Sequence, residues 1–455
     1  MTTMPITTYH EALNYIYSYI SYNPADTSRW DLNRLNDLLE RMGNPHQQYP
    51  SILIAGTKGK GSTAAICERI LRVTGHKTGL YTSPHVHSFR ERIRIGGELI
   101  AEELMVSLIN RYRSMFEATD DLTIFELITA LAFVAFADAE VEAGVIEVGL
   151  GGRLDATNAI NPTVSVITPI SYDHTQILGN TLTLIACEKA GIVRSQGLVV
   201  SAPQPEEARL AIEAFCDEKQ ATLYQVEDLY TWLITDHSSD GQRVIAQPLS
   251  GNFEPLIMQI PLIGEHQIIN TLTALTAINK FAQKTGLIVH ESALTSGIAT
   301  VEWPGRMEIL SREPYLILDS AMNGDSAEKL VETLTTYFPN QPVTLLFGAS
   351  NDHPVNDMLT ALLPLAKQTF MVASRHSRAE KPARLVEFAA TLGYEVSAMP
   401  DVSAALEIAL AQAESNSVVC IAGSLFLAAD ARELWLKKNA VSLPPIDPVM
   451  DFRSE

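Results

Sequence analysis

The chain has 455 residues, of which 46% are hydrophobic and 19% charged, and its formal net charge is −20 at pH 7. This length predicts two or three domains, and the composition is that of a globular protein. The acidic excess argues against nucleic acid as a partner, because a surface that binds it must neutralise phosphates. No apolar run reaches the roughly 18 residues that span a bilayer, so no membrane partner is expected either.

Cysteine spacing and the N-terminal residues indicate the compartment. The four cysteines lie far apart and form no CxxC pair, so neither a disulfide framework nor a structural zinc site is expected. The first residues lack the basic segment followed by an apolar one that marks a secretory signal. We therefore expect a cytoplasmic protein with reduced thiols.

The first predicted elements form a phosphate-binding loop. An apolar run at 52–55 leads into a glycine-rich segment, and a helical pattern follows at 63–73. The segment consists of Gly56, Thr57, Lys58, Gly59, Lys60, Gly61 and Ser62. Backbone N–H groups and the helix N-terminus bind anions in such a turn, while Lys60 can reach the outer phosphates and Ser62 can hold Mg²⁺. Gly61 interrupts the usual spacing, and the alternative is a plain glycine-rich turn.

Apolar β-branched runs then alternate with helical patterns. Strands are predicted at 51–55, 79–82, 143–148 and 163–168, and helices at 102–116, 123–137, 182–190 and 264–280. This alternation predicts an α/β fold with a mainly parallel sheet covered on both faces. Ligands bind beyond the carboxyl ends of such strands. The phosphate-binding loop, Glu147 and His174 all follow predicted strands and are expected to converge at that edge.

A Pro-Gly segment at 301–306 is typical of a linker. After it, strands are predicted at 315–318, 343–347, 369–373 and 417–422, with helices between them. We therefore predict an N-terminal P-loop-type parallel-sheet ATPase domain at 1–303 and a smaller C-terminal Rossmann-like α/β domain at 304–455.

Eight motifs occur along the chain and together carry a family resemblance. They are GTKGKGST at 56–63, SPHVHSFRERIRIGG at 83–97, TIFELITALAF at 123–133, EVGLGGRLDATN at 147–158, DHTQILG at 173–179, EKAGI at 188–192, GEHQIINTLTAL at 264–275 and WPGRME at 303–308. In this order they resemble the folylpolyglutamate synthase and dihydrofolate synthase group of the Mur ligase superfamily.

The resemblance implies an ATP-dependent ligase that adds glutamate to dihydropteroate, to folates or to both. ATP would phosphorylate the substrate carboxylate, and the glutamate amine would then displace phosphate from the acyl phosphate. Small-molecule substrates, ATP, Mg²⁺ and a monomeric state are all implied by this similarity.

The resemblance also implies roles for individual residues. The implied catalytic residues are Lys60, His174 and Lys189. The ATP contacts implied beyond the loop at 56–62 are Asn270, Arg306 and Asp319. The implied metal ligands, for one ion or for two, are Ser62, Ser83, Glu147, His174 and Lys189. The implied substrate pocket consists of Ser83, Pro84, His85, Phe125 and Asp155.

Two of these assignments have structural alternatives. The family carries the lysine at Lys189 as an N-carbamate, whose two oxygens bind a second metal, whereas the alternative is a surface lysine. Phe125 is equally compatible with stacking on a flat heterocycle and with a place in the helix core.

One C-terminal segment departs from the family pattern. Where the family has Asp-Gly-Ala-His-Asn-Pro, residues 319–324 read DSAMNG, so Met322 replaces a histidine and His353 is the candidate to supply an imidazole instead. Two alternatives stay open at this point. One is a related amide ligase that uses another carboxylate or amine, and the other is a nucleotide-binding protein that has lost ligation.

Overall fold

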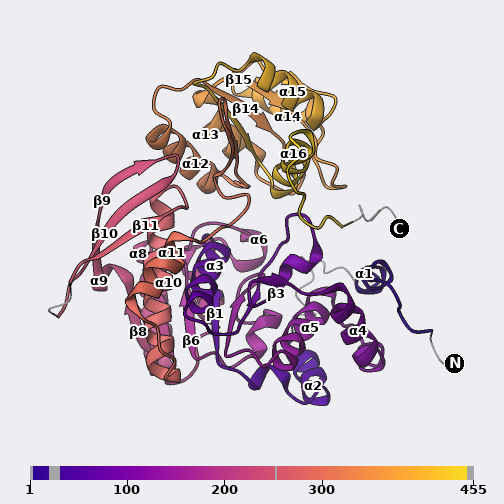
Figure 1. Cartoon of the computed structure of the whole chain (residues 1–455), viewed down its shortest axis with the longest axis vertical. Coiled ribbons are helices and arrows are strands. Elements are labelled where there is room, and N and C mark those ends of the chain that lie inside the picture. The colour runs from indigo at the N-terminus through magenta and orange to yellow at the C-terminus, as the bar shows by residue number, and fades with distance from the viewer. Residues whose placement is uncertain (1–3, 20–30, 252–253, 448–455) are drawn as a thin grey trace.

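The computed structural model describes residues 4–19, 31–251 and 254–447, which are organised around three β-sheets. Figure 1 shows two bodies, with the indigo to pink part of the chain below and the orange to yellow part above. The alternation of strands and helices confirms the predicted α/β class. No helix in the described part of the chain has the length and apolar character needed to cross a membrane.

The largest sheet has eight strands in the order β4-β3-β2-β5-β1-β6-β7-β8. The strands are β1 Ser51–Ala55, β2 Thr78–Tyr81, β3 Ile93–Ile95, β4 Glu98–Leu99, β5 Ala143–Glu147, β6 Val164–Ile167, β7 Leu198–Ser201 and β8 Thr222–Gln225. The six strands from β2 to β8 in this order are parallel, and β3 and β4 add an antiparallel edge. The carboxyl ends of β1, β5 and β6 therefore lie side by side.

Alternate residues of β1 enter different cores, as the period of a strand requires. Leu53 and Ala55 pack with one helical layer, and Ile52 and Ile54 pack with another. The first layer contains α1 Tyr9–Tyr17, α2 Asn33–Arg41, α4 Glu102–Glu117 and α5 Ile124–Asp138. The second contains α3 Lys60–Val73, α10 Glu265–Thr285 and α11 Glu291–Ala299. Two more helices, α7 Leu182–Ala190 and α8 Glu206–Glu218, form a separate cluster with β6 and β7.

A three-stranded antiparallel sheet follows the large sheet along the chain. It consists of β9 Tyr230–Ser238, β10 Gly241–Pro248 and β11 Leu256–Ile260, with α9 Val226–Leu229 before it. Val244, Ala246, Met258 and Ile260 point into the core shared with α10. The other face is exposed, and the resulting mixed pattern explains why the pairing is weakly encoded in the local sequence.

The third sheet has six strands in the order β12-β13-β17-β14-β15-β16. They are β12 Glu308–Arg312, β13 Tyr315–Leu318, β14 Val343–Phe347, β15 Ala366–Met371, β16 Ser397–Ala398 and β17 Val418–Ala422. One face is covered by α12 Gly324–Tyr337, α13 Val355–Leu362 and α14 Pro382–Thr391, and the other by α15 Val402–Gln412 and α16 Leu425–Lys438. This layered arrangement supports the proposed division into domains at 1–303 and 304–455.

Candidate active site

The phosphate-binding loop connects β1 to α3. The first hydrogen bond of α3 runs from Thr63 N to Gly59 O at 2.8 Å. The N–H groups of Lys60, Gly61 and Ser62 therefore have no acceptor within the helix and point outward from its N-terminus. Aligned N–H groups and the positive end of the helix dipole form a site for an anion such as a phosphate.

Two other amides of the loop are already used. Thr57 N and Lys58 N both donate to Pro169 O, at 3.0 and 3.1 Å, which ties the loop to the segment that follows β6. The Lys58 ammonium pairs with Asp173 at 3.1 Å. Contacts of Thr57 and Lys58 with ATP, which the sequence predicted, would therefore use their side chains.

Lys60 and Lys189 meet at the carbonyl of Gly56. Lys60 Nζ donates to Gly56 O at 3.1 Å, and Lys189 Nζ donates to the same oxygen at 2.8 Å. Lys189 lies in the last turn of α7 and is only 4% exposed, which excludes the alternative of a surface lysine. Burial, and then the charge of Lys60, hold the pKa of Lys189 well below that of an ordinary lysine. The site therefore favours the neutral amine of Lys189.

Glu147 is the last residue of β5 and lies beside Ser83. Its carboxylate is 6% exposed and accepts a hydrogen bond from Ser83 N at 3.0 Å. Burial raises the pKa of Glu147, while Lys60 and the Ser83 N–H oppose this shift. Ser62, in the first turn of α3, is also buried. Carboxylate and hydroxyl oxygens are ligands that Mg²⁺ accepts.

His174 follows Asp173 on the other side of the loop. It caps α6, Thr175–Leu178, from a left-handed conformation with φ of 47°, and its side chain is 55% exposed. Partial desolvation of this half-exposed ring lowers the pKa of His174, Asp173 opposes this shift, and the charges of Lys189 and Lys60 add to it. These lysines therefore act electrostatically on the His174 ring. In the described ranges, no three or more His, Cys, Asp or Glu side chains are grouped to hold a metal ion.

Asn270 touches the loop from α10, whereas Arg306 of the linker acts through its charge on Glu147 and on Asp319, which follows β13. The Asn270 amide lies so close to Gly59 that a side chain at Gly59 would overlap its Oδ1. The Arg306 charge lowers the pKa of both Glu147 and Asp319, against the upward effect of burial on each. Asp319 accepts hydrogen bonds from Met307 N at 3.0 Å and Ala321 N at 2.8 Å.

A substrate loop, defined here as residues 83–92, leads from β2 to β3. The Glu91 carboxylate accepts from the backbone N–H groups of Val86, His87 and Ser88 at 2.8 to 2.9 Å, which fixes the turn from within. His85 is held by Arg92, whose Nε donates to Nδ1 at 2.9 Å. Pro84 is exposed beside them.

Phe125 and Asp155 shape the glycine-rich segment after β5. The Phe125 ring lies 6.2 Å from the Tyr81 ring and close against Gly149, where a Cβ would be 2.5 Å from Cζ. The buried Asp155 carboxylate accepts from Leu150 N at 2.8 Å and Thr157 N at 3.0 Å. Asp155 thus holds the backbone of this segment, and direct contact with substrate stays a prediction.

Comparisons with known proteins agree on the family. Residues 54–278 match the Mur ligase middle domain, and residues 305–425 match the Mur ligase glutamate ligase domain. The dihydrofolate synthase/folylpolyglutamate synthase of Bacillus subtilis is 31% identical over 433 residues, which cover 94% of this chain and 99% of that protein. The Escherichia coli protein of the same name is 32% identical over 92% of this chain and 94% of its own. The chain belongs to the folylpolyglutamate synthase/dihydrofolate synthase family.

Solved structures of this family share the fold. Escherichia coli FolC in complex with DHPP and ADP has a TM-score of 0.85 and 30% identity, covering 96% of this chain and 100% of that chain. Mycobacterium tuberculosis folylpolyglutamate synthase with ADP and AMPPCP has a TM-score of 0.83 and 30% identity, covering 94% of this chain and 99% of that chain. Members of the family are thus ATP-dependent Mur-type ligases, and their nucleotide complexes support ATP binding.

The segment that departs from the family pattern still reaches the N-terminal site. Asn323 Nδ2 donates to Asp173 Oδ2 at 3.2 Å, so the start of α12 contacts the residue that pairs with Lys58. Met322 N donates to Ser326 Oγ at 3.0 Å. Burial lowers the pKa of His353, and the Asp173 charge acts on it in the opposite direction. His353 is thus close enough to Asp173 to feel its charge, and no direct contact of its ring with the N-terminal site is found among the described residues.

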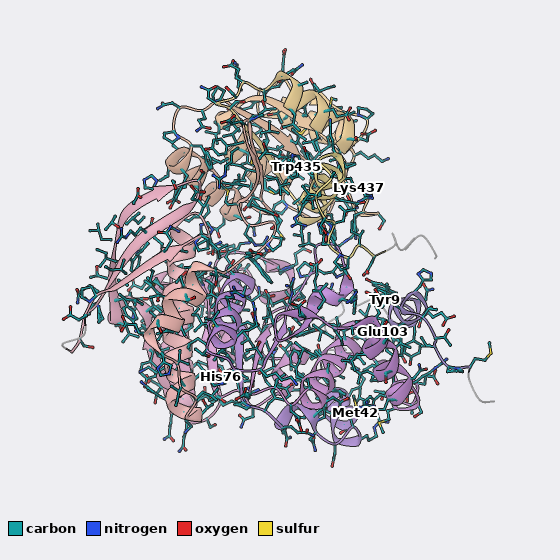
Figure 2. The ribbon with its side chains drawn as sticks, viewed as in Figure 1. Tyr9, Met42, His76, Glu103, Trp435 and Lys437 are labelled. Carbon is teal, nitrogen blue, oxygen red and sulfur yellow. The ribbon has the colours of Figure 1, made fainter. Side chains whose placement is uncertain are left out.

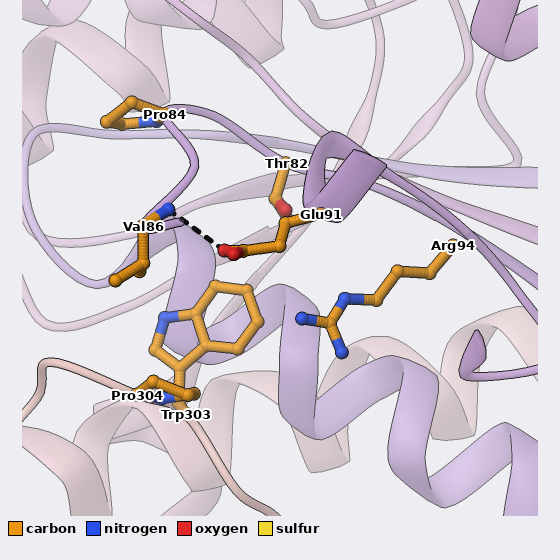
Figure 3. A pocket seen from close by; sticks show the side chains of 7 residues that line it. All are labelled: Thr82, Pro84, Val86, Glu91, Arg94, Trp303 and Pro304. Carbon is orange, nitrogen blue, oxygen red and sulfur yellow. Dashed lines mark hydrogen bonds between the residues drawn. The ribbon is translucent and has the colours of Figure 1, made fainter. Parts of the chain in front are cut away.

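The sequence analysis assigned no role to Trp303, whose side chain connects the linker to the substrate loop and to the phosphate-binding loop. Figure 3 shows its ring beside Glu91 and Arg94. These side chains help to line a cavity of about 30 Å³. The cavity, large enough for a water molecule or two, is lined by Thr82, Pro84, Val86, Glu91, Arg94, Trp303 and Pro304. The indole also packs on the phosphate-binding loop, where a Cβ at Gly61 would lie 3.1 Å from Cζ2. The WPGRME motif marked the segment but gave no sign of this contact.

Two further site residues carried a sequence signal that was not used. Asp173, in DHTQILG, joins Lys58 and Asn323. His266, in GEHQIINTLTAL, lies at the start of α10, and burial lowers its pKa to about 4. Both stand inside motifs that identify the family, yet their partners lie in distant segments.

Proposed function

We propose that this chain joins L-glutamate to dihydropteroate, to folates or to both, using ATP and an acyl phosphate intermediate. The observation that carries the proposal is the convergence of the phosphate-binding loop, Glu147 and Lys189 at one sheet edge, in a chain that matches family members over nearly their whole length. We also propose a monomer, as the family resemblance implies.

Phosphoryl transfer requires positioning and neutralisation of charge. In the proposed reaction the γ-phosphoryl group of ATP passes to a carboxylate oxygen of the substrate, and ADP leaves. The glutamate nitrogen then attacks the acyl carbon, and the C–O bond to phosphate breaks. The N–H groups of Lys60, Gly61 and Ser62 would hold the phosphates, and the Lys60 ammonium would meet the charge on the outer ones.

The residues present fit a magnesium ion. Ser62, Ser83 and Glu147 offer hard oxygen ligands, and the Ser83 to Glu147 hydrogen bond places two of these residues together. Bound there, Mg²⁺ would neutralise charge on the phosphates during transfer. Burial raises the pKa of Glu147, and a bound cation would oppose that shift by favouring the ionised carboxylate.

Lys189 fits the proposed carbamate. Burial lowers the pKa of its amine and so favours the neutral form, and only a neutral amine adds CO₂. Addition forms a C–N bond and releases one proton to solvent, and the nitrogen keeps one N–H, which can continue to donate to Gly56 O, where Nζ now donates at 2.8 Å. The new anion would be balanced by Lys60 and would lie in the region of His174, the other ligand proposed for a second ion.

The carboxylate substrate is proposed to lie between the substrate loop and Phe125. Ser83, Pro84 and His85 begin that loop, and Ser83 contacts Glu147 directly. A carboxylate placed beside Ser83 would thus be near both the phosphate-binding loop and the proposed metal ligands. Phe125, half-buried against Gly149, would present its ring to the flat heterocycle.

The test is a panel of ligation assays with matched omissions. ADP release and product mass are measured with ATP and glutamate plus dihydropteroate, the same mixture with tetrahydrofolate, and each mixture lacking glutamate. We expect a product heavier by one glutamyl residue with at least one carboxylate. Turnover only with another amine would support a related amide ligase, and nucleotide binding without turnover would support a protein that has lost ligation. Either outcome would overturn the proposal.

The Lys60→Ala variant serves as the control for this panel. Loss of a charge-stabilising contact in a water-excluded site costs roughly 10²-fold to 10³-fold in kcat. We expect product formation to fall by at least that factor while the circular dichroism spectrum and Tm stay near those of the unmutated protein. A folded Lys60→Ala variant with ordinary turnover would refute the role assigned to the loop.

A further inference from the structure

The chain returns to the N-terminal domain after its last helix. Figure 1 shows the yellow segment leaving α16 and running down between the two bodies toward the side where α1 lies. Figure 2 places Tyr9, the first residue of α1, below the helix that carries Trp435 and Lys437. We call residues 439–447 the C-terminal strap, and Asp447 is its last described residue.

Asp447 makes four contacts with the N-terminal domain. Its carboxylate accepts from Ser88 Oγ at 2.9 Å, Phe89 N at 2.5 Å and the Tyr9 hydroxyl at 3.0 Å. Its own N–H donates to His87 O at 3.0 Å. Three consecutive residues of the substrate loop are therefore bound by one residue that follows them by more than 350 positions.

The chemistry of these contacts favours a firm attachment. Phe89 begins the short helical turn Phe89–Arg92, so the carboxylate meets an N–H group at its free end. Ser88 and Phe89 are fully buried, and hydrogen bonds to an ionised acceptor are stronger than neutral ones. Burial, and also Asp447, raise the pKa of Tyr9, so its hydroxyl stays protonated and donates.

A second residue of the C-terminal domain holds the same loop. Arg432, on α16, donates from Nη1 to His87 Nε2 at 3.2 Å and from Nε to Glu308 Oε1 at 2.8 Å. His87 is thus bound through its ring by α16 and through its carbonyl by the strap. At the other end of the loop, Ser83 N is bound to Glu147. The loop is therefore attached to the phosphate site at one end and to the C-terminal domain at the other.

We propose that Asp447 is a positioning residue for the carboxylate substrate: by binding Ser88, Phe89 and Tyr9, the C-terminal strap fixes the substrate loop in the conformation that receives that substrate. This inference rests on the proposed function. Asp447 lies outside the eight motifs that carry the family resemblance, yet it would contribute to substrate affinity. Its contacts would also make the conformation of the loop depend on the position of the C-terminal domain.

The experiment compares Asp447→Ala and Asp447→Asn with Glu395→Gln in the full chain. Glu395 is exposed on the C-terminal domain, so its variant controls for loss of one negative charge far from the loop. Hydrogen exchange of peptides covering residues 86–91 reports on the loop without requiring activity. Steady-state kinetics then give kcat and the KM values for ATP and for dihydropteroate or tetrahydrofolate.

For Asp447→Ala we expect at least tenfold faster exchange at His87 to Phe89 and about a tenfold higher KM for the carboxylate substrate, with kcat and the KM for ATP within twofold. Asp447→Asn, which keeps one acceptor oxygen, should lie between Asp447→Ala and the unmutated chain, and Glu395→Gln should change neither readout. Tyr9→Phe should raise the KM by a smaller factor and add nothing in the Asp447→Ala background, because both changes remove the same contact.

Unchanged exchange in both Asp447 variants would overturn the strap, whatever the kinetics show. Faster exchange with an unchanged KM for the carboxylate substrate would overturn the positioning role. Equal losses of kcat and of affinity for ATP and carboxylate, together with a lower Tm, would also overturn it, since they would indicate a merely structural contact. If the unmutated chain ligates neither substrate, the proposed function fails, and the exchange result still decides whether the strap holds the loop.

Discussion

Two buried ionisable residues of opposite type face the phosphate site. Lys189 is 4% exposed and Glu147 is 6% exposed, and burial shifts the pKa of each toward its neutral form. A neutral lysine can react with CO₂, and a neutral glutamic acid can ionise when a cation binds. Carbamate formation at Lys189 and cation binding at Glu147 would therefore each act on a group whose charged form is disfavoured by burial.

The carbamate is directly observable. We expect protein equilibrated with ¹³C-bicarbonate at neutral pH to show a carbamate carbon resonance in the NMR spectrum. Lys189→Met should lose both this resonance and ligase turnover, whereas Lys77→Met, at an exposed lysine, should keep both. An unmodified Lys189 amine in fully active protein would contradict the prediction.

Glu147→Gln should stabilise the ligand-free protein while destroying its function. Because the pKa of Glu147 is raised on folding, the folded state binds more protons between the unfolded and folded pKa values, and stability falls as pH rises through that window. The neutral amide avoids this loss. We expect a higher Tm than the unmutated protein at pH 7 without Mg²⁺ or ATP, and turnover reduced by roughly 10²-fold.

The control for Glu147→Gln is a pH series. At a pH well below the unfolded pKa both states are protonated, so the Tm difference should largely vanish there. Glu395→Gln, at an exposed acid, should show no such pH-dependent gain. A Glu147→Gln variant that is less stable at pH 7 would show that the contacts of the carboxylate, including Ser83 N, outweigh the cost of its burial.

At the scale of elements, the turn between β1 and α3 is packed so tightly that no side chain fits at Gly59. Gly59 caps α3 with φ of 82°, a left-handed conformation that costs other residues about 1–2 kcal/mol, and the Asn270 amide occupies the space a Cβ would need. The loop from β1 and the helix α10 therefore fit together only if position 59 is glycine.

Gly59→Ala should weaken nucleotide binding and stability beyond the backbone effect alone. Gly75→Ala is the matched control, because Gly75 has φ of 92° but no atom within 4 Å of an added Cβ. We expect a larger fall in Tm for Gly59→Ala than for Gly75→Ala, and weaker ADP binding by calorimetry only for Gly59→Ala. Adding Asn270→Ala should recover part of the Tm loss at Gly59. Equal effects of the two alanines would show that the Asn270 contact is unimportant.

At the scale of the whole molecule, the two α/β bodies meet across the proposed site. Asn323 on the C-terminal side binds Asp173, and Tyr337 donates to Gln242 Oε1 at 2.6 Å. Trp303, in the linker, packs on Gly61 of the phosphate-binding loop. Two domains that are joined by a short linker and meet through polar contacts are expected to move as rigid bodies, because only a large hydrophobic interface would lock them together.

Closure about the linker is therefore expected to accompany ligation, since it would keep water from an acyl phosphate. Binding of ATP and the carboxylate substrate should reduce the radius of gyration in small-angle scattering and change the fluorescence of Trp303. The Trp303→Phe variant should retain the scattering change and lose the fluorescence change. No change in either measurement with both ligands bound would refute closure.

The sequence by itself determined the strands and helices that carry the site. Local patterns sufficed because burial alternates with a period of two in strands and 3.6 in helices. The strands predicted at 51–55, 315–318 and 343–347 and the helix at 182–190 are found with those bounds. The glycine-rich turn was equally local, and it gave the phosphate-binding loop and its Lys60.

Only the tertiary structure decided which distant groups meet. Lys189 reaches Gly56 across 133 residues, Asp447 reaches Ser88 across 359, and Trp303 packs on Gly61 through the placement of the linker. The antiparallel sheet β9 to β11 was likewise settled by packing on α10, since its half-exposed strands give a weak local signal. Periodicity records whether a side chain is buried, but its partner is set by how the layers and the two domains pack together.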